Sequence, residues 1–207
     1  MKGTRTRQSI LDRAVDLASV EGLEGLTIGR LAEDLGMSKS GLFAHFGSKE
    51  ELQLATVEAA QQRFLAEAFL PALKAERGYA RLHAICMSWV SYVRRNVFPG
   101  GCFFAAASFE FDGRPGLVRN AIVKAMEEWV AAIERAIVAA QELGELDAEI
   151  EPAQLAFELN SLFFGVNFSY QLRRDRKALM RAEKAIETRL EGLRIVKPAR
   201  RLRSARR

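Results

Sequence analysis

The sequence predicts an all-α protein, and two of its features lead to that fold class. Apolar residues recur at spacings of three and four along the chain, as Leu82, Ile85 and Trp89 do in the segment 79–97. Glycine and proline separate the periodic segments, most clearly in Asp-Gly-Arg-Pro-Gly at 112–116. The apolar fraction of 49% is typical of a soluble globular protein. We therefore expect a succession of helices with turns between them.

The chain length and the apolar pattern limit the class of protein. The 207 residues are compatible with one or two domains and can bury a core. No run of about 18 uncharged apolar residues occurs, so no membrane-spanning helix is expected. Asp12 and Asp16 interrupt the apolar part of the N-terminal segment, which therefore does not resemble a signal peptide. These features predict a cytoplasmic protein.

The positive charge is concentrated at the C-terminal end. Residues 194–207 contain seven basic residues and no acid, and subtracting them from the net charge of +5 leaves −2 for residues 1–193. The segment 194–207 is therefore predicted to be a disordered basic tail. Such a tail can add sequence-independent affinity for phosphates, or it can serve only to keep the protein soluble.

A smaller basic cluster lies at the other end, where Lys2, Arg5 and Arg7 occur without an acid. Residues 1–9 are predicted to form a flexible arm, and the apolar residues of 10–18 then form one face of the first helix. Such an arm either reaches a nucleic acid or is only a solvated terminus.

The most informative stretch is 27–52, TIGRLAEDLGMSKSGLFAHFGSKEEL. Thr27 is a favourable N-cap for a helix that stops at Gly36, a residue suited to the left-handed backbone conformation. Ser38 caps a second short helix, and Ser48 caps a third. Two short helices joined by a glycine-containing turn of three to four residues form a helix-turn-helix.

This stretch resembles the DNA-binding signature of the tetracycline-repressor (TetR) family of bacterial transcription regulators. The residues that match the family motif are Thr27, Leu31, Ala32, Gly36, Met37, Ser38, Leu42, Phe43, His45, Phe46, Ser48, Lys49, Glu50 and Leu52. The resemblance implies a three-helix DNA-binding domain at 1–50 and a helical ligand-binding and dimerisation domain at 51–193. It also implies a repressor that an effector releases from DNA.

The first turn of the second helix of a helix-turn-helix is where the base edges of double-stranded DNA are read. Lys39 is the candidate for a guanine contact, because it is the only long hydrogen-bond donor in that turn. Thr27 caps a helix whose free N–H groups can bind a phosphate. Lys49 opposes the dipole of its own helix, which favours a role as a phosphate ligand. The expected DNA-binding residues are Arg5, Arg7, Thr27, Ser38, Lys39, Ser40, Gly41, Phe43, His45 and Lys49.

The resemblance assigns contacts with the DNA backbone to Phe43, His45 and Lys49. Phe43 stands where the family more often has tyrosine, so the hydroxyl group that would bond a phosphate is missing. Its ring can still pack on the sugar backbone. For His45, a place as a partly buried polar residue between helices is the alternative.

The rest of the chain is expected to form further helices at about 48–70, 79–97, 102–111, 116–143, 152–172 and 175–193. Pro71 ends or kinks the first of them. Segment 116–143 has two apolar stripes, and 152–172 is apolar nearly all round, so both must be covered on most sides. The other helices of the same monomer can cover them, or a second copy of the chain can.

By resemblance, helices 116–143 and 152–172 form a four-helix interface between the two copies of a homodimer. A two-fold dimer sets two recognition helices about one turn of DNA apart, roughly 34–36 Å, and therefore predicts a palindromic operator.

Aromatic residues in the C-terminal part indicate a pocket for a small apolar or aromatic effector. Asn160 and Asn167 add polar groups to an otherwise apolar helix. The candidate ligand-binding residues are Trp89, Tyr92, Phe103, Phe104, Phe109, Asn160, Phe163, Phe164, Asn167 and Phe168. An effector bound there is expected to shift the helix at about 48–70 and release the DNA.

Two other functions remain open. Cys86 or Cys102 could act as a redox-sensing thiol, although small buried apolar residues are the simpler interpretation. A helical enzyme acting on a lipophilic substrate would need an acid–base pair or a metal site, and the spacing of Glu110, Asp112 and His83 supports neither. With only two histidines in the chain, no metal or other cofactor is expected.

Overall fold

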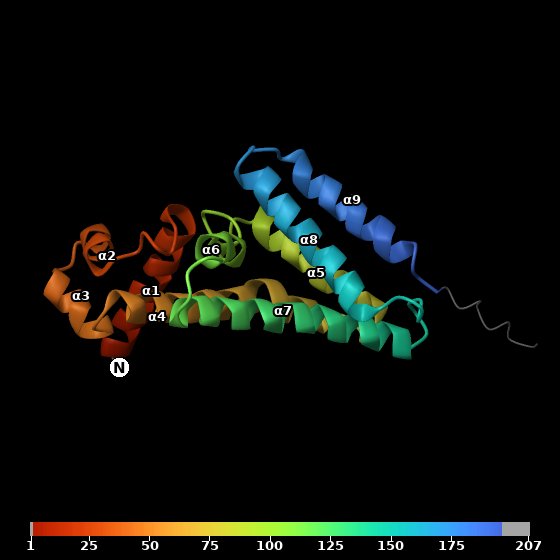
Figure 1. The fold of residues 1–207 in the computed structure, drawn as a ribbon, viewed down its shortest axis with the longest axis horizontal. Coiled ribbons are helices and arrows are strands. Elements are labelled where there is room, and N and C mark those ends of the chain that lie inside the picture. Colours follow the sequence, from red (N-terminus) through yellow and green to blue (C-terminus); the bar gives the residue numbers. More distant parts are fainter. Residues whose placement is uncertain (1, 196–207) are drawn as a thin grey trace, which may run out of the picture.

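The computed structural model describes the backbone of residues 2–195 and the side chains of residues 6–195. The helices in this part are α1 (Lys2–Glu21), α2 (Ile28–Leu35), α3 (Lys39–Phe46), α4 (Lys49–Phe64), α5 (Tyr79–Arg94), α6 (Phe103–Phe111), α7 (Leu117–Glu142), α8 (Pro152–Gln171) and α9 (Lys177–Glu191) (Figure 1). The only extended pairing within residues 2–195 is an isolated bridge between Leu146 and Arg194. The predicted all-α class is confirmed, and residues 196–207 of the predicted tail lie outside the described part.

The first helix begins earlier than expected. Because α1 starts at Lys2, the prediction of a flexible arm over residues 1–9 is wrong from Lys2 onward. The Arg7 guanidinium lies over the Phe46 ring, 5.3 Å from its centroid, so the start of α1 packs against α3. The side chain of Arg5 lies outside the described residues.

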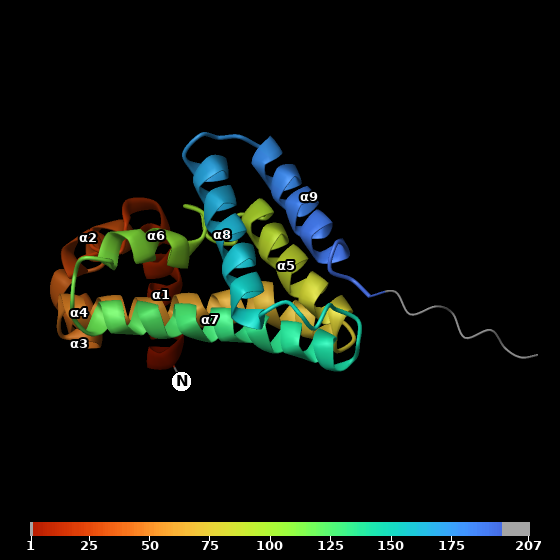
Figure 2. The ribbon, with the colours of Figure 1, turned by 45° about the vertical axis from the view of Figure 1, so that its right-hand side comes forward.

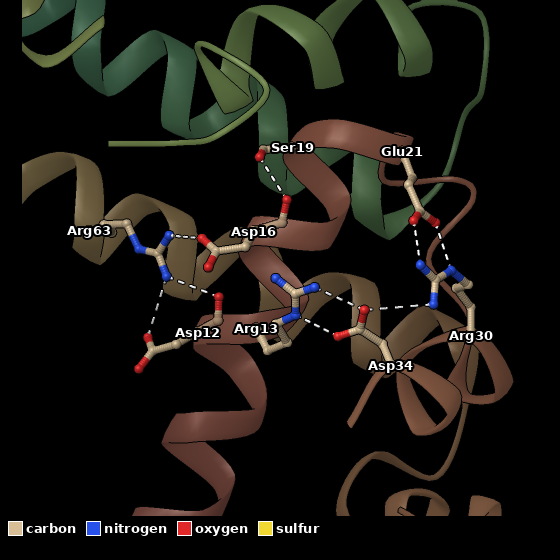
Figure 3. A network of polar contacts seen from close by, with 8 residues as sticks. All are labelled: Asp12, Arg13, Asp16, Ser19, Glu21, Arg30, Asp34 and Arg63. Carbon is tan, nitrogen blue, oxygen red and sulfur yellow. Dashed lines mark hydrogen bonds and ion pairs between the residues drawn. The ribbon is translucent and has the colours of Figure 1, made fainter. Parts of the chain in front are cut away.

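The N-terminal unit comprises α1, α2, α3 and the first turns of α4 around a small aliphatic core. Ala14, Val15, Leu31, Leu42 and Leu52 are all fully buried in it. Ion pairs surround this core (Figure 3). They join Arg13 to Asp34 (2.5 Å), Arg30 to Glu21 (2.5 Å) and Asp34 (3.8 Å), and Arg63 to Asp16 (2.5 Å) and Asp12 (3.6 Å). Exposed ion pairs add little stability each, but their geometry holds α2 and α4 against α1.

The helix predicted at about 48–70 changes its hydrogen-bonding pattern at Leu65. There α4 continues as a π-helical turn, η1 (Leu65–Phe69), and then as a 3₁₀ turn, η2 (Leu70–Lys74). Pro71 has no N–H group to donate to the carbonyl four residues earlier, which belongs to Glu67. Arg95 Nη2 in the segment after α5 donates to that carbonyl instead, at 2.7 Å. The irregular end of α4 is therefore stabilised from outside the helix.

The C-terminal part is arranged around α7, which packs along α4 and also contacts α5, α6 and α8 (Figures 1 and 2). Helices α8 and α9 form an antiparallel pair that stands across α7 (Figure 2). The core here is aromatic, with Tyr92, Phe98, Phe103 and Phe163 among the largest fully buried side chains. This aromatic core surrounds the cavity described below.

Candidate DNA-binding surface and effector cavity

The turn between α2 and α3 follows from the conformation of one glycine. Gly36 has φ 62° and ψ 27°, a left-handed conformation in which a side chain would be strained. Its N–H group bonds the carbonyls of Ala32 and Glu33, and the next N–H, of Met37, donates to the Ala32 carbonyl at 2.9 Å. The last turn of α2 is thereby closed, and the chain reverses toward α3.

The helix caps predicted from the sequence are confirmed. Three hydroxyl oxygens accept backbone N–H groups: Thr27 Oγ1 from Arg30 (3.0 Å), Ser38 Oγ from Gly41 (3.1 Å) and Ser48 Oγ from Glu51 (3.1 Å). Each cap satisfies one of the free N–H groups at the start of its helix. The Thr27 and Ser48 hydroxyl groups also keep their own protons, which they can donate to a phosphate oxygen, and Ser38 Oγ lies 3.3 Å from Ser40 Oγ, so this pair shares one hydrogen bond and keeps one proton to donate.

One face of α3 is available for contact with another molecule. Leu42 and Phe46 on the opposite face are buried and fix the helix to the core. Of the predicted contact residues on α3, Lys39, Ser40 and Phe43 are exposed, whereas Gly41 and His45 are half-buried. Phe43 is 55% exposed, so the phenyl ring is free to pack on a sugar or base.

Lys39 also lies close to the start of α2. A Cβ atom at Gly29 would lie 3.4 Å from Lys39 Cε and 3.9 Å from Thr27 Oγ1. The lysine side chain therefore crosses the first turn of α2, where free N–H groups and the positive end of the helix dipole favour an anion. A phosphate placed there would meet the ammonium group and the helix N-terminus together.

Lys49 has an acidic partner that the sequence did not suggest. Its Nζ atom lies 2.8 Å from Glu24 Oε1, and Arg114 Nη1 lies 3.5 Å from the same oxygen. The hydrogen bond from Lys49 is the main cause that lowers the pKa of the Glu24 carboxyl group. This ion pair explains a lysine in the first turn of α4, so a phosphate would have to compete with Glu24 for it.

A cavity of about 250 Å³ lies between α4, α5, α7 and α8, with the N-terminal half of α6 at one side. Its aromatic lining residues are Phe64, Phe69, Trp89, Phe104, Trp129, Phe163 and Phe164. Trp89 stacks on Phe163 with 4.5 Å between ring centroids, and Trp129 meets Phe64 edge-on at 5.1 Å. The cavity is thus walled by rings in fixed mutual orientations.

Half of the residues predicted to bind a ligand line this cavity. They are Trp89, Phe104, Asn160, Phe163 and Phe164. Residues that were not singled out as ligand contacts lie in α4, η1 and α7, including Phe64, Leu65, Phe69, Trp129 and Ala132. Their apolar positions at helical spacing were the only signal in the sequence, and that signal does not separate a cavity wall from a core.

The other five predicted residues lie elsewhere. Tyr92 and Phe103 are buried in the core behind the cavity wall. Asn167 has a structural role, because its Oδ1 atom accepts the backbone N–H of the α6 N-cap residue at 2.8 Å. Phe109 is 69% exposed and Phe168 is 56% exposed. A helix that is apolar nearly all round does not reveal which of its faces points inward.

The cavity has few polar groups. The side-chain amide of Asn160 lines it, and at its edge Gln61 Nε2 donates to Glu128 Oε2 at 2.7 Å. Glu128 and Arg135 are the only charged residues among the described residues of the lining, and both are exposed. A second cavity of about 550 Å³ between α6, α7 and α8 shares Asn160 and two other lining residues with the first.

The C-terminal part is bonded directly to the turn between α1 and α2. Glu110 in α6 accepts the backbone N–H groups of Leu23 at 2.8 Å and Glu24 at 2.9 Å. In the loop before α6, the Gly100 N–H group donates to Ser19 Oγ at 3.1 Å. A Cβ atom at residue 100 would lie 1.6 Å from the Ser19 carbonyl oxygen, so only glycine permits this contact. The carboxylate of Glu110 therefore serves as a cap of that turn.

The two cysteines are both buried. Burial raises the pKa of the Cys86 thiol to about 12, and burial also raises the pKa of the Cys102 thiol. Because the thiolate is the reactive form, these environments do not favour a redox sensor. Within residues 2–195, no group of His, Cys, Asp or Glu side chains has an arrangement that could hold a metal ion, and no helix is long and apolar enough to cross a membrane.

A helix-turn-helix next to a helical domain with an internal aromatic cavity is the arrangement of a DNA-binding regulator. Two family models match the chain: "Bacterial regulatory proteins, tetR family" over residues 10–56, and "Tetracyclin repressor-like, C-terminal domain" over residues 78–186, more than half of the sequence. The chain therefore belongs to the TetR family of transcriptional regulators, whose members are not enzymes.

Individual relatives agree with this assignment. The chain is 29% identical over 196 residues to the HTH-type transcriptional regulator TcmR of Streptomyces glaucescens, covering 92% of this chain and 83% of TcmR. It is 46% identical over 54 residues to the HTH-type transcriptional repressor AcnR of Corynebacterium glutamicum, covering 26% of this chain and 29% of AcnR. A TetR transcriptional regulator from Chloroflexus aurantiacus has the same fold, with a TM-score of 0.87, 24% identity and coverage of 94% and 99%.

Proposed function

We propose that this protein is a ligand-responsive repressor that binds a palindromic operator as a homodimer and releases it when an effector occupies the aromatic cavity. One observation carries the proposal: α4 lines the cavity near its C-terminal end, and the same helix packs against α1 and α3 of the DNA-binding unit. Occupancy of the cavity and the position of the DNA-binding surface therefore depend on the same helix.

Two routes connect the cavity with the DNA-binding unit. In α4, Phe64 lines the cavity, and the preceding Arg63 bonds Asp16 of α1 at 2.5 Å. In α6, Phe104 lines the cavity, and Glu110 caps the turn between α1 and α2. An effector that displaces either helix must bind the DNA-incompetent form more tightly than the competent one, because only this difference in affinity can release DNA.

We place the dimer interface on α8, which is one of the two predicted helices (152–172), and on α9 in place of the other predicted helix (116–143). Within the monomer α7 already packs against four other helices. Large apolar side chains are exposed on α8, just after its end and on α9: Phe157 (67%), Phe168 (56%), Leu172 (70%) and Met180 (67%). On α7 the most exposed is Leu117 (59%), the first residue of the helix. Phe157 and Phe168 are about three turns apart on α8 and therefore lie on one face of the helix, and an exposed apolar face favours a protein–protein interface.

The DNA contacts proposed for each half-site follow from the surface of α3 and the start of α2. Lys39, Ser40 and Phe43 face outward from α3, and Thr27 and Ser38 supply hydroxyl groups at two helix N-termini. We propose that these residues make the principal contacts. Arg7, His45 and Lys49 lie at the edge of this surface, where each already contacts another residue of the protein.

In the test, the purified protein is incubated with a random-sequence DNA pool, and the DNA that it retains is sequenced. Light scattering measures the molar mass of the protein. We expect one palindromic motif and the mass of a dimer. A Phe168→Glu variant should weaken the dimer and the selection together, because it places a charge on the proposed α8 interface. Retention of DNA without any sequence preference would contradict the proposal.

A further inference from the structure

We propose that the effector is an uncharged, planar aromatic molecule of about two fused rings with one hydrogen-bonding group, which the Asn160 amide recognises. This inference rests on the proposed function in one respect only, namely that the occupant of the cavity is the effector. The size, the walls, the charge and the polar group of the cavity each restrict the ligand independently.

The volume sets the size of the ligand. A cavity of about 150 Å³ lined by apolar side chains binds benzene. The cavity between α4, α5, α7 and α8 holds about 250 Å³, so one ring would leave it partly empty. Two fused rings fill it better, whereas a larger ring system would have to extend past Asn160 into the second cavity.

The walls set the shape. Trp129 presents its ring near Phe163 at a centroid distance of 5.9 Å and a tilt of 47°, and Phe64 stands edge-on to Trp129. Such a wall offers both ring faces and ring edges. A planar aromatic ligand gains stacked and edge-to-face contacts with them, beyond the gain from burying its apolar area.

The electrostatics of the cavity exclude ions of either sign. Its charged lining residues within the described part of the chain are Glu128 and Arg135, which have opposite signs and stand exposed at the edge. Gln61 already donates to Glu128. A charged ligand inside would lose its hydration without gaining a buried counter-ion, and that loss is costly.

One polar group inside remains available. The Asn160 side chain is half-buried and makes no side-chain hydrogen bond within residues 6–195. Asn167, two turns further along α8, is different, because its oxygen is already used by a backbone N–H group. An amide can both donate and accept, so Asn160 suits a hydroxyl, a carbonyl or a ring nitrogen.

The chain carries its own reporter for the test. It contains two tryptophans, Trp89 and Trp129, and both line the cavity, so ligand binding changes their fluorescence directly. The full-length protein is titrated with three probes that share one ring system: 2-naphthol, 2-naphthoate and the 2-naphthylmethylammonium ion. Calorimetry provides the affinities. We expect 2-naphthol to bind, and both charged probes to bind at least about tenfold more weakly.

Two pairs of variants locate the site. Asn160→Leu should weaken 2-naphthol binding by roughly threefold to tenfold, since it removes one hydrogen bond, whereas Ser161→Ala on the outward side of α8 should not. Ala132→Leu fills the cavity and should abolish binding. Ala139→Leu, on α7 outside the cavity, should leave 2-naphthol binding unchanged.

The outcomes separate this inference from the proposed function. If a charged probe binds as tightly as 2-naphthol, if 2-naphthol does not bind, or if Ala132→Leu leaves the affinity unchanged, the ligand class is wrong. Selection on random DNA tests the regulator independently of any probe. A palindromic motif together with release by a charged compound would contradict only the ligand class. Probe binding as predicted without any specific DNA binding would contradict only the proposed function.

Discussion

The two halves of the molecule hold their helices in place by different means. The N-terminal unit has a small, mainly aliphatic core with ion pairs around its edge (Figure 3). The C-terminal part has a core of aromatic rings around a void of about 250 Å³. Displacing a helix in a close-packed core loses contacts on every side, whereas helices around a void can move into it. The first unit is therefore suited to presenting a fixed surface, and the second to responding to a ligand.

The largest effect is expected in the aliphatic core. Leu42 is fully buried and anchors α3, so Leu42→Ala should lower the free energy of unfolding by about 2–5 kcal/mol and abolish specific DNA binding. Urea unfolding followed by circular dichroism measures the first effect. Phe43→Ala is the control, because this neighbouring residue is exposed and its loss should change stability by only about 0.5 kcal/mol. Equal losses of unfolding free energy in Leu42→Ala and Phe43→Ala would contradict the contrast between the buried and exposed faces of α3.

The next effect concerns the junction between the two halves. Glu110→Ala leaves the N–H groups of Leu23 and Glu24 without their acceptor, which should cost about 1–3 kcal/mol of stability. Effector affinity should stay the same while release of DNA by effector becomes weaker, as measured by fluorescence anisotropy of labelled operator. Glu110→Gln keeps one acceptor oxygen, so its stability and its release of DNA should lie between those of the wild type and Glu110→Ala. If Glu110→Ala releases DNA as readily as the wild type, coupling runs through α4 alone.

The same contrast explains how much could be predicted from the sequence. Capping and turn formation are local, so Thr27, Gly36 and Ser38 could be assigned individually. The π-helical turn η1, which precedes Pro71, is stabilised by a hydrogen bond from Arg95, and because Arg95 is distant in sequence, no local pattern revealed this turn. The cavity likewise depends on which side of each helix faces inward, and an apolar period alone does not define that side.

Lys39 allows a finer test of the DNA-binding surface, because its side chain lies between a base-reading position and the start of α2. If it contacts a phosphate, Lys39→Ala should weaken binding to all sequences by a similar factor and reduce the slope of affinity against salt by about one. If it contacts a guanine, the variant should lose about 1–3 kcal/mol only for sites with that base. Operator titrations at several salt concentrations decide between them. Lys74→Ala in η2 is the control, because this exposed lysine lies on neither proposed interface, and it should change neither quantity.

The smallest effect on stability is expected from removing one of two comparable ion pairs, Arg13–Asp34 in the N-terminal unit or Arg189–Glu158 in the C-terminal part. Hydrogen bonding to Arg13 is the main cause that lowers the pKa of Asp34, and hydrogen bonding to Arg189 does the same for Glu158. A lowered pKa in the folded state means that the pair stabilises the protein fully above the unfolded-state pKa, about 3.9 for Asp and 4.3 for Glu, and that this contribution is lost as the pH falls through the folded-state value. Because both pairs are partly exposed, each contributes at most about 1 kcal/mol.

Asp34→Asn and Glu158→Gln should therefore each lower stability in urea at pH 7, and the difference from the wild type should shrink as the pH falls below about 4. Only the first should also weaken operator binding, because Asp34 joins α2 of the helix-turn-helix to α1, whereas Glu158 joins α8 to α9. A stability difference that persists unchanged at low pH would show that lost packing causes it. An equal loss of operator binding in both variants would show that the α8–α9 pair positions the DNA-binding surface as strongly as the ion pairs around α1 do.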